Sequence, residues 1–143
     1  MHAHCWRGLY PTDAIQYEVH RLVPLIKAMV IEIEQHDGVC VLRCKGPFVS
    51  GANLEYMLAK IDQIRKLKCN KVLADFREVT SIGSMGLTFI VAVYTSVVKD
   101  RDGRFVVAGA LPFVRKALDL TRLSKVVNLA PDTTTGLAAL LAE

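Results

Sequence analysis

A strand pattern that passes through a short loop into a helix pattern limits the fold of this sequence more than any other feature. Residues 71–75 are mostly apolar, as expected for a strand in a sheet that helices cover. The helix pattern spans residues 84–99, and its predicted buried stripe consists of Leu87, Ile90, Val91, Tyr94 and Val98. The loop presents Ser84 at the start of this helix, where free N–H groups and the helix dipole favour negative charge.

Two strands and a helix are predicted before this segment. Residues 29–34 and 39–45 have strand patterns on either side of the turn signal 36–38, so they form a leading hairpin. Gly46-Pro47 is expected to end the second strand. Ser50-Gly51 then precedes a helix whose apolar stripe consists of Leu54, Met57, Leu58, Ile61 and Ile64.

The C-terminal part continues the alternation of strands and helices. We expect a buried strand over residues 105–109, a helix beginning near Pro112 and a small strand over 126–128. Asp132 or Thr133 is predicted to cap a terminal helix. The resulting order, β-β-α-β-α-β-α-β-α, predicts an α/β fold with a mixed, largely parallel sheet and about four amphipathic helices.

The length of 143 residues indicates one domain. Residues 1–28 differ in composition from the rest of the chain, so we interpret them as an N-terminal extension and residues 29–143 as the folded domain. The net charge is +4, but no basic run is dense enough to indicate nucleic-acid binding. No apolar run approaches about 18 residues, which argues against a membrane span, and the N-terminus lacks a signal-peptide layout.

The four cysteines indicate a reduced, cytoplasmic protein. Cys40 and Cys44 lie on the same face of one predicted strand, roughly 13 Å apart, too far for a disulfide. No C-x-x-C pair occurs.

The element order and the segment DFREVTSIGSMGL, residues 75–87, resemble the STAS domain family, named for sulphate transporters and anti-sigma factor antagonists. Members carry a strand ending in D-[LF]-x-x-[VL]-x-x-[IM]-D-S-S-G-L before an amphipathic helix. The resemblance covers about residues 29–143 and includes the strand at 103–108 and the link at 118–124. Two motif positions differ here: Gly83 replaces the aspartate and Met85 the second serine.

The resemblance implies a protein-binding regulator. In soluble members, an anti-sigma factor that is itself a serine kinase phosphorylates the first serine of the motif, which is Ser84 here. The unphosphorylated form binds that kinase and frees the sigma factor. The partner-binding residues implied are Thr80, Ser81, Gly83, Ser84, Met85, Gly86 and Leu87, together with the exposed face of the helix 84–99.

Simpler interpretations of the same residues stay open. Ser84 can be a helix N-cap, which is compatible with phosphorylation. Asp75 is expected to end its strand by capping loop amides, and the hydroxyls of Thr80 and Ser81 to bond within a turn. The glycines of the loop suit tight backbone, and no nucleotide-binding motif is present.

No catalytic arrangement is evident in the sequence. We find no nucleophile set among a histidine and a carboxylate, and no carboxylates paired for acid–base work. His2, His4 and Cys5 could be read as a metal cluster, but no fourth ligand lies nearby. We therefore predict a protein that is not an enzyme and needs neither cofactor nor metal.

The resemblance, taken with these observations, implies a bacterial, cytoplasmic anti-sigma factor antagonist that controls transcription through protein binding, as a monomer or weak dimer. Its expected partner is an anti-sigma factor serine kinase. The alternative is a STAS scaffold or transport-associated module that binds its partner through the same surface without phosphorylation. A weak enzyme or a nucleotide binder is a third possibility.

Overall fold

The computed structural model describes residues 29–36, 38–48 and 54–142, which form one mixed sheet with helices on both faces. The strands lie in the order β1-β2-β3-β4-β5. Their bounds are β1 Val30–His36, β2 Val39–Phe48, β3 Lys71–Ile82, β4 Arg104–Ala108 and β5 Asn128–Ala130. β1 pairs antiparallel with β2, and every other neighbouring pair is parallel. The predicted hairpin and largely parallel sheet are confirmed.

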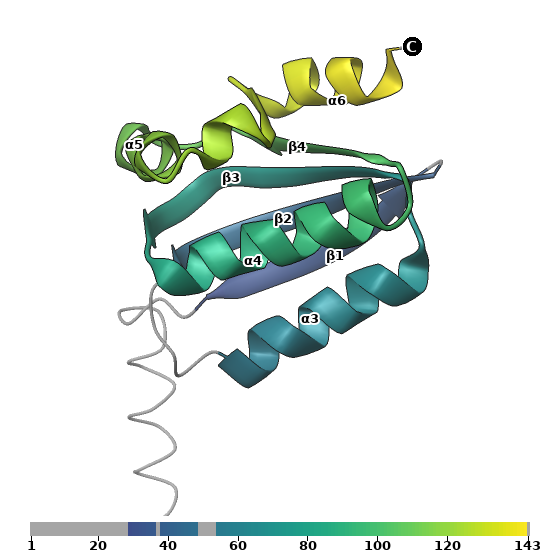
Figure 1. Cartoon of the computed structure of the whole chain (residues 1–143), viewed down its shortest axis with the longest axis horizontal. Helices are drawn as coiled ribbons and strands as arrows, with labels where there is room; N and C mark the ends of the chain where they lie inside the picture. The colour runs from purple at the N-terminus through teal and green to yellow at the C-terminus, as the bar shows by residue number, and fades with distance from the viewer. Residues whose placement is uncertain (1–28, 37, 49–53, 143) are drawn as a thin grey trace, which may run out of the picture.

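Helices cover the two faces of the sheet unequally (Figure 1). The helices are α3 Leu54–Leu67, α4 Ser84–Tyr94, α5 Pro112–Leu120 and α6 Thr133–Leu141. A π-helical turn, η2 Thr95–Lys99, extends α4, and a 3-10 turn, η3 Leu123–Lys125, follows α5. α3, α4 and α5 contribute to the larger core cluster, while α6 packs against the opposite face.

Alternating side chains of the central strands build both cores. In β3, Val72, Ala74 and Phe76 belong to the larger cluster on the side of α3 and α4. Leu73 joins Val106 and Leu140 in the smaller cluster beneath α6. Because neighbouring residues of a strand face opposite sides, one apolar strand serves both layers, as expected for a sheet covered on both faces.

Two strands run further than the sequence analysis predicted. β2 continues through Gly46 and Pro47 to Phe48, and β3 continues past Asp75 to Ile82. The pairing between them shifts register twice, once between Arg43 and Lys45 and again between Gly46 and Pro47. Gly46 adopts φ 85°, which a glycine tolerates without steric cost. The irregularity therefore bends the strand pair and does not end it.

The expectation of reduced cysteines is wrong for one pair. Cys40 and Cys69 form a disulfide, with their Cα atoms 6.1 Å apart. The parallel register places Cys40 opposite Val72, close to the turn that precedes β3. Spacing along one strand could not reveal this partner, which lies 29 residues away in the sequence. Cys44 is free and buried, and burial, with a contribution from Asp75, raises the pKa of its thiol well above the usual range.

The C-terminal elements agree closely with expectation. α5 begins at Pro112, and the last strand lies at Asn128–Ala130, two residues beyond the predicted start. Of the two capping candidates, Asp132 is the N-cap of α6, since its Oδ1 accepts a hydrogen bond of 2.7 Å from the Thr135 amide. This bond lowers the pKa of Asp132.

Several predictions lie outside the described residues. These are the extension 1–28, the His2, His4 and Cys5 cluster, and the Ser50-Gly51 start of the first helix. Across the described ranges, no helix combines the length and apolar character that crossing a membrane would require.

The disulfide predicts a redox-dependent stability. Reduction of Cys40–Cys69 should lower the free energy of unfolding by about 3–4 kcal/mol, because the bond restricts the unfolded chain. Denaturant unfolding with and without reductant measures the difference, and peptide mapping should recover Cys40 linked to Cys69. A Cys44→Ala variant should keep the difference and a Cys69→Ser variant should lose it. Equal stability of both redox forms would contradict the prediction.

Candidate functional site

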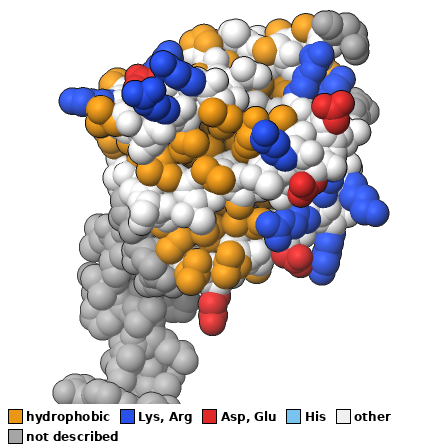
Figure 2. All heavy atoms as spheres, in the orientation of Figure 1, with side chains coloured by type: hydrophobic (Ala, Val, Ile, Leu, Met, Phe, Trp, Pro, Cys, Tyr) orange, Lys and Arg blue, Asp and Glu red, His pale blue; other side chains and the backbone are white. Residues whose placement is uncertain are grey.

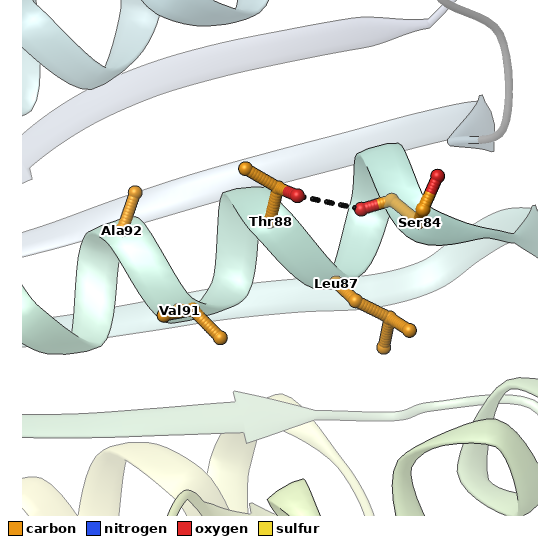
Figure 3. Close-up of a pocket in the computed structure, with 5 residues that line it drawn as sticks. All are labelled: Ser84, Leu87, Thr88, Val91 and Ala92. Atoms are coloured by element: carbon orange, nitrogen blue, oxygen red, sulfur yellow. Dashed lines mark hydrogen bonds between the residues drawn. The ribbon is translucent and has the colours of Figure 1, made fainter. Parts of the chain in front are cut away.

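Ser84 is the first residue of α4 and is exposed. The N-cap is Gly83, in an extended conformation with φ −132° and ψ −157°, and no side chain of the described residues caps the helix. The interpretation of Ser84 as the N-cap is therefore wrong by one residue. Its backbone carbonyl accepts a hydrogen bond of 2.8 Å from the Thr88 hydroxyl (Figure 3).

Within the described residues, the first amides of α4 have no side-chain partner. The Gly83 amide donates to the Phe48 carbonyl at 3.0 Å, and the first intrahelical bond runs from the Leu87 amide to the Gly83 carbonyl at 3.0 Å. The amides of residues 84–86 precede that bond and receive no side-chain cap. An anionic group on Ser84 would lie next to these donors and the positive end of the helix dipole.

Gly86 is buried and allows α4 to approach the ends of β2 and β3. A Cβ atom at this position would collide with the Ile82 side chain and lie 2.9 Å from the Phe48 Cβ. Phe48 in turn packs against Phe76 and Phe89, with ring centroids 5.8 Å apart in each pair. The structure therefore gives Gly86 a packing role inside the predicted partner-binding set.

The buried side of α4 differs from the predicted stripe. The buried residues include Phe89, Ile90 and Val93. Of the predicted stripe, only Ile90 is fully buried, whereas Val91 is 44% exposed and Leu87, Tyr94 and Val98 are partly exposed. Because α4 is apolar nearly all round, its periodicity does not identify the buried side.

The outer surface of α4 carries an open hollow of about 420 Å³, lined in the described part of the chain by Ser84, Leu87, Thr88, Val91 and Ala92. In Figure 3, the Leu87 and Val91 side chains project from one side of the helix, and those of Ser84, Thr88 and Ala92 from the other. From Val79 to Val98 the chain has no charged residue. An exposed helix normally carries charges on its outer face, whereas the centres of protein interfaces are depleted of them.

Thr88 and Ala92 are not singled out in the sequence analysis, which assigns Val91 to the buried stripe, whereas Val91 is exposed. The sequence feature that could have identified them is the uncharged run 79–98. Any residue of this run that is exposed adds to an uncharged surface. We refer to the five residues that line the hollow as the α4 surface.

The other predicted partner-binding residues differ in their exposure and in the element to which they belong. Thr80 and Ser81 lie in β3, Thr80 exposed and Ser81 partly buried, so the expectation that both sit in a turn is wrong. Ser81 is opposite Pro47 in the strand pairing. Met85 and Leu87 are partly buried and pack against the larger core cluster. Gly83 alone separates β3 from α4.

Asp75 does not end its strand, and it points to the face of the sheet opposite α4. It shares a shallow groove with Leu137 of α6. Its Oδ1 accepts bonds from the Arg77 amide at 3.1 Å and from Arg77 Nε at 3.0 Å, and its Oδ2 accepts one from Nη2 at 2.9 Å. Hydrogen bonding to Asp75 raises the pKa of Arg77. Asp75 therefore accepts a hydrogen bond from a backbone amide, as expected, but this amide belongs to β3 and not to a loop. Asp75 has no part in the α4 surface.

The π-helical turn after α4 fixes the far end of the helix. Ser96 is buried, donates to the Ala92 carbonyl at 2.9 Å and accepts from Arg65 Nε at 3.0 Å. The bond from Arg65 joins α3 to the π-helical turn that follows α4. Within the ranges that the structure covers, no group of three or more His, Cys, Asp or Glu side chains could hold a metal ion.

The STAS domain family matches residues 30–136, most of the chain. The chain belongs to this family. A curated relative, the anti-sigma F factor antagonist of Paenibacillus polymyxa, is 23% identical over 99 residues, which cover 69% of this chain and 84% of the relative.

Solved structures share the STAS fold. An anti-sigma factor antagonist from Mycobacterium paratuberculosis is 24% identical with a TM-score of 0.72, and the match covers 80% of this chain and 96% of that one. The Bacillus cell fate determinant SpoIIAA in its phosphorylated form is 15% identical with a TM-score of 0.60, covering 77% and 98%. At these identities the likeness shows the fold alone.

The uncapped start of α4 predicts a stabilising substitution in this STAS domain. Gly83→Asp should raise the free energy of unfolding by about 0.5–1 kcal/mol at neutral pH, because a carboxylate at the N-cap accepts from a free amide and complements the dipole. Such a bond lowers the pKa of the new carboxyl, so the gain should be present above about pH 4 and be lost as pH falls further. Denaturant unfolding at several pH values measures it.

Gly83→Asn is the matched control for this substitution. It caps without a charge, so its smaller gain should persist at low pH. A pH-independent effect of Gly83→Asp, or no gain at all, would show that the carboxylate does not reach the helix amides.

The close approach at Gly86 predicts a destabilising substitution. Gly86→Ala should cost about 1–3 kcal/mol of unfolding free energy, because the added methyl group must displace Ile82 or Phe48. Thr88→Ala, on the exposed side of the same helix, should change stability by less than about 0.5 kcal/mol. Equal stability of Gly86→Ala and the parent protein would show that α4 can shift without cost.

Proposed function

We propose that this STAS protein is an anti-sigma factor antagonist whose binding to an anti-sigma factor serine kinase is switched by phosphorylation of Ser84. The observation that carries the proposal is the exposed Ser84 hydroxyl at the uncapped start of α4, on the border of the uncharged α4 surface. The Paenibacillus relative and the phosphorylated Bacillus structure support it through their descriptions as an anti-sigma factor antagonist and a phosphorylated protein.

The local chemistry suits a phosphate. Transfer of the γ-phosphoryl group of ATP to the Ser84 hydroxyl would add about −1.5 to −2 charges. The amides at the start of α4 would stabilise this charge within the protein. The same charge would disfavour a partner that packs on the neighbouring apolar side chains, since a buried charge without a counter-ion is costly.

The two motif differences lie on either side of Ser84. Gly83 leaves the helix start without a competing carboxylate, and Met85 uses the place of the second serine for core packing. Ser84 is therefore the one residue with a hydroxyl at the two serine positions of the motif, and it is exposed. The proposal places the protein in a bacterial cytoplasm, where thiols are kept reduced, so binding should be measured with Cys40 and Cys69 both oxidised and reduced.

Ser84 substitutions test the switch. Ser84→Ala should keep binding to the kinase and abolish its phosphorylation, while Ser84→Asp should weaken binding at least tenfold, about 1.4 kcal/mol, because of the added charge. Calorimetry with the serine-kinase anti-sigma factors of the source genome measures binding, and mass spectrometry after incubation with ATP locates the phosphate.

Thr134→Asp provides the matched control. Thr134 lies exposed in the first turn of α6, on the opposite face of the sheet, so the same charge there should leave kinase binding unchanged. If Ser84→Ala and Ser84→Asp bound the kinase equally, or if phosphate appeared at Thr80 or Ser81 and not at Ser84, the switch would be disproved.

A STAS scaffold or transport-associated module is the second candidate. The replacement of two motif residues by Gly83 and Met85 favours it, because a site that is no longer phosphorylated is free to change. The α4 surface would then bind a partner constitutively. Neighbouring genes distinguish the candidates: a serine kinase with a sigma factor supports the first, and transporter subunits support the second.

A further inference from the structure

The α4 surface continues toward a cluster of basic residues. α5 packs into the same core as α4 through Val114 and Leu118, so both helices border the same side of the molecule. Figure 2 shows apolar side chains gathered between α4 and α5, and Lys and Arg side chains gathered over α5. Phe113 of α5 is 53% exposed and adds a large apolar group.

The charge around α5 and η3 has one dominant sign. The exposed charged residues of this segment are Arg115, Lys116, Asp119, Arg122 and Lys125, four basic and one acidic. None of the four described salt bridges involves these residues. By contrast, the basic residues Arg43, Lys45 and Lys66 each pair with an acidic neighbour. Among the residues that the structure describes, the basic side chains of the α5–η3 segment therefore have no acidic partner in a salt bridge.

We propose that the α4 surface and the α5–η3 segment together form a docking site for an acidic amphipathic helix of the protein partner. Its apolar face would cover Leu87 and Val91, and its carboxylates would face the basic residues of α5 and η3. This deepens the proposed function, on which it rests, by stating the chemistry through which the kinase is recognised. The arrangement agrees with the usual pattern of interfaces, with an uncharged centre and a charged rim.

A second copy of this chain does not suit the site. A symmetric contact would bring the same patch of both copies together and place the α5–η3 segments near one another. Four basic residues on each side would then repel. An acidic partner meets no such penalty.

The same charge pattern predicts that phosphorylation of Ser84 weakens the binding of the partner. A phosphate on Ser84 adds negative charge at the border of a site that accepts a negatively charged helix. Repulsion between this phosphate and the carboxylates of the helix would weaken the binding of an acidic partner. A basic partner would instead be attracted to the phosphate, so the modification is a stronger off-switch for an acidic partner than for a basic one.

Two designed peptides test the docking site even while the kinase is unidentified. Both are amphipathic helices of about 18 residues with leucines on one face, and they carry either glutamates or lysines on the other. Amide chemical shifts of the isotope-labelled full-length protein report the contacts. The glutamate peptide should shift residues 84–95 and 112–125, and added salt should weaken it. The lysine peptide should bind at least tenfold more weakly.

Charge-reversal variants locate the basic rim. Arg115→Glu combined with Lys116→Glu should weaken the glutamate peptide about tenfold. Lys66→Glu combined with Lys68→Glu makes the same change of charge at the exposed end of α3 and should have no effect. Thermal unfolding of each variant confirms that it is folded.

Three outcomes would overturn the docking site: no binding of the glutamate peptide, equal binding of both peptides, or shifts confined to β1 or α6. Failure of the proposed function is separate. If the glutamate peptide binds as expected but no kinase phosphorylates Ser84, the docking site stands and the switch fails. If Ser84 is phosphorylated and the peptides do not discriminate, the switch stands and the docking site fails.

Discussion

The contact of Gly86 with Ile82 and Phe48 determines where the first turn of α4 lies, and the candidate site depends on that position. Because this residue lacks a Cβ, the helix can rest directly on the ends of β2 and β3. The bond from the Gly83 amide to the Phe48 carbonyl fixes the single residue between strand and helix. Ser84 is then exposed for a geometrical reason: it lies two residues before the buried glycine, away from the packed side of the helix.

The order of elements could be predicted because it depends on local pattern. Apolar residues at a period of 2 or 3.6 report which element forms, and the alternation of the two reports the parallel sheet. The ends of β2 and β3 could not be predicted in this way. Gly and Pro within a strand pattern usually mark the end of the strand or a bulge. Here a bulge and a positive φ at Gly46 absorb the irregularity while the pairing continues. The hydrogen bonds that pair two strands join backbone atoms, so the side-chain pattern of either strand does not show where the pairing ends.

The candidate site was predicted in part. Ser84, Gly86 and Leu87 were identified from the loop motif, yet the buried side of α4 was assigned wrongly. Periodicity needs polar residues to mark the outer face, and none of the residues from 79 to 98 is charged. The Cys40–Cys69 bond escaped prediction for a different reason, because it depends on the register of two strands far apart in the sequence.

The lack of charge that hid the outer face of α4 is also what would make one phosphate decisive. At an interface already rich in charged pairs, two further negative charges are screened and find counter-ions, and exposed pairs contribute about 1 kcal/mol or less. None of the described side chains that line the α4 surface is basic, so none of them could neutralise a phosphate once a partner covers it. The desolvation penalty of an unpaired buried charge is several kcal/mol, which corresponds to a change in affinity of two orders of magnitude or more. An uncharged helix with one exposed hydroxyl at its start therefore needs no change of fold to act as a switch.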